Sequence, residues 1–210
     1  MTADGTATLV YVHDPMCSWC WGFEPTRVAL FDALEGRLPI RRMVGGLAPD
    51  SDQPMPRELQ VALQQTWQRI QQVIPGTRFN FDFWSECAPR RSTYPANRAV
   101  IAARRQNEDF DAKMTARIQR AYYLEARNPS DDDTLIDLAG DIGLDRDRFA
   151  RELVDATTRE IFADELQATR AMGIDGFPSL ALLRGRELYR IRLDYNDAAA
   201  MLAQLEALTG

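Results

Sequence analysis

Two cysteines separated by two residues, Cys17 and Cys20, stand where a predicted strand gives way to a predicted helix. The strand is Thr8–His13, which alternates β-branched and aromatic residues and is ended by an Asp-Pro pair. A helical pattern of apolar residues then runs from the first cysteine to about Leu34, and a second strand follows within Leu38–Leu47. This order predicts a βαβ unit whose strands lie parallel, with a right-handed crossover.

The end of the chain carries a second set of strand signals. Phe177–Leu193 is typical of a hairpin, and Asn196–Gly210 is typical of a final helix capped by Asn196 or Asp197. Residues 51–172 contain helical patterns and few strand candidates. We therefore expect an α/β chain in which residues 1–50 and 173–210 share one mixed sheet, and residues 51–172 form an inserted helical domain.

The helices expected in this insertion follow from apolar periodicity and from capping residues. Ser92-Thr93 is a candidate cap for the second helix, and Ser130 with Asp133, and Thr157 with Glu160, are capping-box patterns for the last two. The expected helices are Arg57–Ile74, Tyr94–Asn107, Glu108–Ala126, Ser130–Gly143 and about Thr157–Gly173. The alternating segment Phe79–Trp84 is expected to be extended and to line a groove.

The position of the cysteine pair favours dithiol chemistry. At a helix N-terminus the first N–H groups lack partners and the helix dipole favours negative charge, so a thiolate on Cys17 is stabilised there. Cys20 lies one turn further on and is placed to attack a mixed disulfide formed at Cys17. Two alternatives stay open: half of a zinc site, which would need more ligands than Cys87 and the single histidine His13 readily provide, and two buried structural thiols. We expect no metal.

Two short motifs resemble one family of thiol–disulfide oxidoreductases. The layout is similar to a thioredoxin-like fold (βαβ plus ββα) with a large all-helical insertion, as in the DsbA family. Within that family, "DPMCSWCWGF" (Asp14–Phe23) and the segment Gly173–Leu183, which contains "GFPSLALL", resemble the FrnE-like, predicted disulfide-isomerase branch. The resemblance implies that Pro178 is a cis-proline facing the cysteines, and that the backbone of Phe177 pairs with a disulfide substrate.

The chain departs from the family at two places. Ser18-Trp19 stand between the cysteines, where strong oxidants of the family carry Pro-His, so we expect the Cys17 thiolate to be less stabilised and the couple less oxidising. Phe177 is bulkier than the β-branched residue common before the cis-proline. The usual substrate geometry at that residue is therefore not assumed.

Neighbouring residues are assigned supporting roles or none. Trp19 is a candidate apolar platform for substrate, whereas aromatic residues at helical spacing usually pack in a core. We expect His13 to be a strand-end histidine with satisfied hydrogen bonds, the alternative being a proton carrier. Asp14 is expected to form a turn, the alternatives being a hydrogen bond to the loop or help in deprotonating Cys20. Cys87 is given no role, and a relay of the disulfide through it stays open.

Composition narrows the function classes. The 210 residues carry a formal net charge of −6, which argues against a nucleic-acid partner, and pairs such as Arg90-Arg91 are expected to be ordinary surface charges. No secretory leader and no apolar run long enough to cross a bilayer is visible, so we expect a cytoplasmic chain with no membrane partner. The sequence does not assign an oligomeric state.

These features predict a cytosolic thiol–disulfide oxidoreductase or isomerase that acts on protein or small-molecule disulfides. No cofactor is expected, with glutathione as a substrate or reductant. One alternative is a glutathione-dependent enzyme, because the fold also resembles kappa-class glutathione transferases and 2-hydroxychromene-2-carboxylate isomerases, and Ser18 could serve as their thiol-activating donor. The other is a non-catalytic protease adaptor that uses the cysteine helix as a binding surface.

Overall fold

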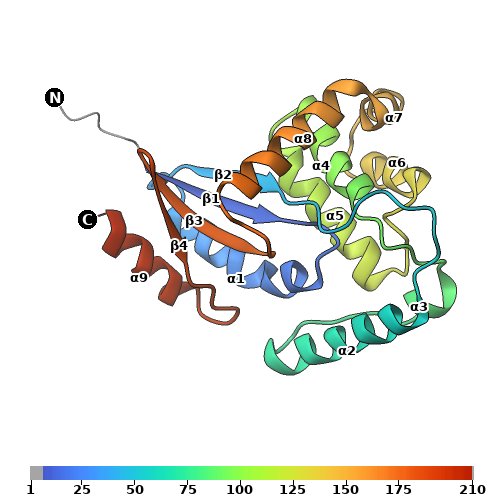
Figure 1. Ribbon diagram of the computed structural model, residues 1–210, viewed down its shortest axis with the longest axis horizontal. Coiled ribbons are helices and arrows are strands. Elements are labelled where there is room, and N and C mark those ends of the chain that lie inside the picture. The colour runs from blue at the N-terminus through green and yellow to red at the C-terminus, as the bar shows by residue number, and fades with distance from the viewer. Residues whose placement is uncertain (1–6, 210) are drawn as a thin grey trace.

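The computed structural model, which describes residues 7–209, contains a four-stranded mixed sheet in the order β2-β1-β3-β4, on the side of the molecule where both ends of the described chain lie (Figure 1). β1 pairs in parallel with β2 and antiparallel with β3, and β3 pairs antiparallel with β4. The strands are β1 (Thr8–His13), β2 (Ile40–Val44), β3 (Ser179–Arg184) and β4 (Glu187–Ile191). The first and last parts of the chain therefore share one mixed sheet, as the sequence predicted.

The helices fall into two groups. α1, which follows β1, and the C-terminal α9 flank the sheet, whereas the helices from α2 to α8 all lie between β2 and β3 in the sequence and gather at one end of the sheet (Figure 1). The helices are α1 (Ser18–Leu34), α2 (Arg57–Val73), α3 (Phe83–Glu86), α4 (Tyr94–Gln106), α5 (Phe110–Leu124), α6 (Asp132–Asp141), α7 (Arg146–Val154), α8 (Ala156–Ala171) and α9 (Ala198–Thr209). The division at residues 51 and 172 stays a prediction.

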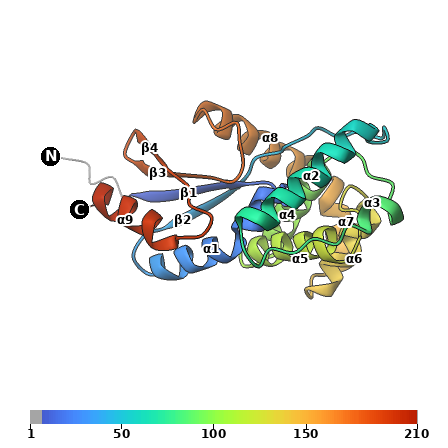
Figure 2. The ribbon, with the colours of Figure 1, turned by 90° about the horizontal axis from the view of Figure 1, so that it is seen from below.

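The two faces of the sheet are covered by different helices. Leu9 and Tyr11 point from β1 into a core shared with α1 and α9, which contribute Phe23 and Met201. The opposite face carries a smaller cluster around Val12, packed against the end of α8 and the segment that follows it. Figure 2 shows α8 on one side of the sheet, with α1 and α9 on the other.

The helical block has an aromatic core that reaches the sheet. Trp67 of α2 is fully buried, and its ring stacks on Phe79 at a centroid distance of 4.8 Å. The same cluster includes Met16 from the β1–α1 connection and Val44 from the end of β2. Because one continuous core joins the block to these two segments, the block fixes the position of the loop that precedes the cysteines.

One local prediction in the block is wrong, and one helix was not predicted. Phe79–Trp84 is not one extended segment: it turns at residues 81–82 and its last two residues begin the short helix α3, because Phe79 and Phe83 are both buried against Trp67. The helix α7 was not predicted, since only Phe149 and Leu153 among its nine residues are buried. So short an apolar pattern gives little periodicity to detect.

The predicted caps were right only at the C-terminal helix. The Asp197 carboxylate accepts hydrogen bonds from the Ala199 and Ala200 N–H groups at the start of α9. The two capping boxes are absent: Ser130 donates to the Ser92 carbonyl at 2.7 Å, and α8 is capped by Asp155. The Ser92-Thr93 pair makes no side-chain cap on α4 either, because the Thr93 hydroxyl donates elsewhere.

Candidate active site

Cys17 is the N-cap residue of α1. Its backbone is extended (φ −81°, ψ 116°), its N–H donates to the Asp14 carbonyl at 3.0 Å, and its carbonyl accepts from the Trp21 N–H at 3.1 Å. The Cys17 side chain therefore stands at the N-terminus of α1, where the helix dipole favours an anionic sulfur. All three cysteines, Cys17, Cys20 and Cys87, are free thiols.

The proline segment meets this cysteine. The Phe177–Pro178 peptide bond is cis, and Pro178 is buried directly before β3. The Cys17 Sγ donates a hydrogen bond to the Phe177 carbonyl oxygen at 3.3 Å, across 160 positions of sequence. The fold thus brings the two motifs into contact, with a backbone carbonyl directed at the outer sulfur.

Cys20 is the inner thiol. It is fully buried, whereas Cys17 keeps 6% of its surface exposed. Burial raises the pKa of Cys20 well above its usual value, a hydrogen bond with Cys17 and the charge of that residue raise it further, and a backbone hydrogen bond from Asp14 opposes the shift. Cys20 is therefore a protonated, inaccessible thiol in the dithiol form, whereas Cys17, itself largely buried, keeps a small exposed fraction.

Asp14 connects three segments around the cysteine loop. Its carboxylate, fully buried, accepts hydrogen bonds from the Met16 N–H (2.8 Å), the Leu47 N–H (2.7 Å), the Thr93 hydroxyl (2.7 Å) and the Asn97 amide (2.8 Å). Burial raises the pKa of Asp14, and these four bonds act against that rise. The residue holds the loop before α1 to the end of β2 and to the start of α4, which is more than the turn that the sequence predicted.

Among the described residues, His13 lacks the hydrogen bonds expected from the sequence. It is fully buried and stacks on Tyr11, with ring centroids 4.9 Å apart, but neither ring nitrogen has a hydrogen-bond partner within residues 7–209. The prediction of a satisfied histidine is therefore wrong. Burial lowers the pKa of His13 well below its usual value, and the positive charges of Arg42, Arg27 and Arg104 lower it further, so the imidazole is neutral.

The two residues between the cysteines have different surroundings. Ser18 is buried in the first turn of α1, whereas Trp19 is half-buried and packs on Tyr195, with ring centroids 5.2 Å apart. Trp19 is thus one half of an aromatic pair that ties α1 to the β4–α9 connection. Its predicted contact with substrate stays a prediction.

Two tyrosines near the sulfurs, Tyr195 and Tyr123, were not identified as site residues from the sequence. Burial raises the pKa of Tyr195 and of Tyr123, and the charges of Cys17 and Cys20 contribute at both residues. Tyr123 of α5 stacks on Trp21 at 5.7 Å, and its buried hydroxyl has no partner in the described part of the chain. Tyr123 is buried in the core of the helical block, but no local signal in the sequence connects either tyrosine to a cysteine.

Cys87 lies apart from the pair. It follows α3, and its thiol donates to the Ala126 carbonyl at 2.9 Å. Burial raises its pKa, as do the charges of Asp131 and Glu86. These contacts anchor the end of α5 and give no support to a relay role.

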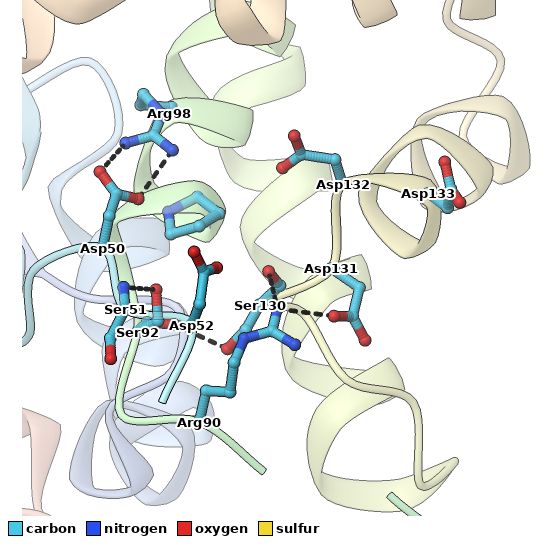
Figure 3. Close-up of a pocket in the computed structure, with 11 residues that line it drawn as sticks. Asp50, Ser51, Asp52, Arg90, Ser92, Arg98, Ser130, Asp131, Asp132 and Asp133 are labelled. Atoms are coloured by element: carbon cyan, nitrogen blue, oxygen red, sulfur yellow. Dashed lines mark hydrogen bonds and ion pairs between the residues drawn. The ribbon is translucent and has the colours of Figure 1, made fainter. Parts of the chain in front are cut away.

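The arginine pairs of the sequence are largely neutralised by acids. An open hollow of about 470 Å³ between the β2–α2 connection and the starts of α4 and α6 illustrates this (Figure 3). In it Arg98 bonds both oxygens of Asp50, and Arg90 bonds Asp131 and the Ser130 carbonyl. Five aspartates line this hollow against two arginines, so it is no phosphate site.

Residues 7–209 contain no cluster of three His, Cys, Asp or Glu side chains placed to hold a metal ion. None of the helices in that range is both long enough and apolar enough to cross a bilayer.

Comparison with known proteins places the chain among thioredoxin-fold proteins. A family model described as thioredoxin matches residues 10–189. A candidate protein disulfide isomerase from Nitrosomonas europaea superposes with a TM-score of 0.85 at 26% identity, covering 98% of this chain and all of that one. The cytosolic disulfide reductase DsbM from Pseudomonas aeruginosa, also solved with GSH, is 30% identical, with a TM-score of 0.76 over 96% of this chain and 98% of its own.

Curated relatives of a different description also match. The ClpXP adapter protein SpxH from Halalkalibacterium halodurans is 25% identical over 170 residues, which is 79% of this chain and 55% of the relative. The chain thus spans about half the length of the curated relatives that it matches.

Proposed function

The chain belongs to the thioredoxin family whose model covers residues 10–189, and on that premise we propose that it is a thiol–disulfide oxidoreductase working through Cys17 and Cys20. The observation that carries the proposal is the 3.3 Å contact between the Cys17 Sγ and the Phe177 carbonyl. It places the outer sulfur beside backbone groups with which an extended substrate can pair. The DsbM structure and the Nitrosomonas structure support the same class of activity.

The two cysteines divide the reaction. The Cys17 thiolate attacks one sulfur of a substrate disulfide, a mixed disulfide forms, and the other substrate sulfur leaves with the electron pair and takes a proton. Cys20 then loses its proton and attacks the Cys17 sulfur, which closes the Cys17–Cys20 disulfide and releases the second substrate thiol. The substrate gains two electrons and the enzyme dithiol loses them. Burial of Cys20 keeps it protonated until Cys17 has reacted.

We propose that in the cell the enzyme reduces disulfides of its substrates, and that glutathione supplies the electrons. A glutathione thiolate attacks the Cys17 sulfur of the enzyme disulfide and Cys20 leaves as a thiol. A second glutathione then attacks the mixed disulfide and releases glutathione disulfide, which restores the Cys17 thiolate. The related cytosolic reductase, solved with GSH, supports this direction and a cytosolic location.

The test is reduction of insulin by dithiothreitol, followed by turbidity. Cys17→Ser should abolish the acceleration, and Cys87→Ser should leave it intact. Cys20→Ser should lose turnover and accumulate mixed disulfides with its substrates. Equal rates for the wild type and Cys17→Ser would refute the proposal.

The adapter relatives favour a second candidate, a protein that binds a client and presents it without chemistry. That function would survive Cys17→Ser, because the aromatic surface of α1 is unchanged. Cys20→Ser distinguishes the glutathione-dependent isomerase from the dithiol enzyme. The isomerase should stay active in this variant, since activation of a bound glutathione thiol through Ser18 needs no second cysteine.

A further inference from the structure

A hollow of about 250 Å³ opens beside the cysteine helix, away from the Phe177 contact. Three segments form it: the first two turns of α1, the α2–α3 connection and the last turns of α5. The side chains that matter to its chemistry are Trp21, Glu24, Pro25, Arg78, Arg120 and Leu124.

The α1 residues of the hollow lie on the helix stripe that starts at the N-cap residue, Cys17. Trp21, Glu24 and Pro25 follow that cysteine at spacings of four, seven and eight residues, which is one stripe of a helix. With a rise of about 1.5 Å per residue, they stand about 6–12 Å from it along the helix axis. Helical side chains lean toward the N-terminus, so Trp21 leans toward Cys17.

The walls of the hollow are fixed by packing. The Trp21 indole N–H donates to the Arg78 carbonyl at 3.0 Å, and its ring stacks on Tyr123 at an interplanar angle of 16°. Glu24 bonds Arg27 through both carboxylate oxygens, at 2.5 and 2.7 Å. The aromatic wall and the acidic edge are therefore in place before any ligand arrives.

Two guanidinium groups in this hollow are available to an anion. Arg78 has no ion pair within residues 7–209, and the ion pair of Arg120 is a long one, 3.9 Å from Glu125. Both side chains are exposed, in a chain whose net charge is −6. Guanidinium forks match carboxylate geometry better than any other side chain does.

We propose that this hollow binds the γ-glutamyl end of glutathione, which carries a carboxylate and an ammonium group, while the glutathione sulfur lies at Cys17. The sulfur is on the middle residue, so its reach to the γ-glutamyl carboxylate is about two residue lengths, or about 7 Å at 3.3–3.6 Å per residue, which falls within the 6–12 Å between Cys17 and the hollow. The γ-glutamyl carboxylate suits Arg78 and Arg120, the ammonium group beside it suits Glu24, and the peptide plane suits the face of Trp21. The inference rests on the proposed function, because it names the part of the chain that recognises the reductant.

The test compares two reductants on one disulfide substrate, hydroxyethyl disulfide. Arg78→Ala and Arg120→Ala should each raise the KM for glutathione about tenfold, the loss expected for one charge-assisted hydrogen bond. With dithiothreitol, which carries no carboxylate, both variants should match the wild type. Arg186→Ala, an exposed arginine in the β3–β4 turn, is the control and should change neither value.

Binding to the inactive Cys17→Ser protein supplies a readout that needs no turnover. Calorimetry with glutathione should show a Kd about tenfold higher when Arg78→Ala is added, and glutathione diethyl ester should bind weakly with or without Arg78. An unchanged glutathione Kd and KM in both arginine variants would overturn the site while leaving the dithiol chemistry intact. A wild type that binds glutathione but reduces nothing would instead overturn the proposed function.

Discussion

The ring of Phe177 occupies the space above Gly45 where a side chain would begin. A Cβ placed on Gly45 would overlap three atoms of that ring, and the Gly45 N–H also donates to the His13 carbonyl at 2.7 Å. The bulky residue before the proline is thus accommodated by a glycine at the end of β2. The Phe177 ring turns onto the sheet edge, and its carbonyl faces Cys17.

Gly45→Ala should therefore impair the activity by moving the proline segment. We expect the rate of disulfide reduction to fall about 10- to 100-fold, as for a misplacement of about 1 Å, with far-UV circular dichroism unchanged. Adding Phe177→Val to Gly45→Ala should restore most of the rate, because the smaller side chain gives the methyl group room. A double variant as slow as the single one would show that the packing of this pair does not set the position of the carbonyl.

The Asp14 carboxylate should contribute strongly to stability. Asp14→Asn replaces one of the two buried carboxylate oxygens with an NH2 group. At least one of the four donors that bond the Asp14 carboxylate in the wild type then faces another donor. We expect a loss of about 2–4 kcal/mol in the free energy of unfolding, measured with urea. Asp132→Asn, in the open hollow of Figure 3, should change it by less than about 0.5 kcal/mol. Equal effects of the two substitutions would contradict the anchoring role.

The strands, the first helix and the cysteine loop could be predicted because their signals are local. Thr8–His13 alternates, Gly45-Gly46 ends the next strand, and the helix starts at the cysteines, so the expected bounds and the observed ones nearly coincide. The meeting of Cys17 with the Phe177 segment has no local signal. It was expected only from the resemblance of two separate motifs to one family.

What the sequence did not predict depends on contacts between distant residues. The sequence around Asp14 does not indicate that Thr93 and Asn97 bond its carboxylate. The sequence around Tyr195 likewise does not indicate that this ring packs on Trp19. The capping boxes failed for a related reason. The Ser130 hydroxyl makes a buried tertiary bond instead of a cap, and tertiary contacts of this kind outweigh local preference.

Burial of His13 should make stability depend on pH. In the folded chain its pKa lies well below 6.5, whereas the unfolded imidazole titrates near that value. Between the two pKa values only the unfolded state binds the proton, so the free energy of unfolding should fall as the pH drops below about 6.5, by up to about 1.4 kcal/mol per pH unit.

His13→Leu should remove this dependence. At about pH 7.5 the variant should unfold within about 1 kcal/mol of the wild type, because an apolar side chain leaves no polar atom unpaired. At about pH 5.5 it should be the more stable of the two by about 1 kcal/mol. The carboxyl groups with raised pKa, Asp14 and Glu165, are present in both proteins, so their contribution cancels in the comparison. Parallel curves of stability against pH would mean that His13 does not titrate in this way.

A buried ion-pair network holds the end of β2 against the helical block. Arg104 of α4 bonds Glu165 of α8, and also Asp111 of α5 at 3.2 Å, and Arg42 of β2 bonds Asp111 as well. Glu165 in turn accepts the Val44 N–H at 2.7 Å, one residue before Gly45. The network therefore sets the strand end on which the Phe177 ring rests.

Arg104→Met should destabilise the chain by about 3–5 kcal/mol, because it leaves Glu165 charged, buried and without a cation. The matched control is Arg146→Met, which removes an exposed pair with Asp137 and should cost at most about 1 kcal/mol. Adding Glu165→Gln to Arg104→Met should recover part of the loss, since the uncompensated charge is then gone. Urea unfolding of the four proteins measures these differences, and an Arg104→Met cost equal to that of Arg146→Met would mean that water, rather than Arg104, compensates the Glu165 charge.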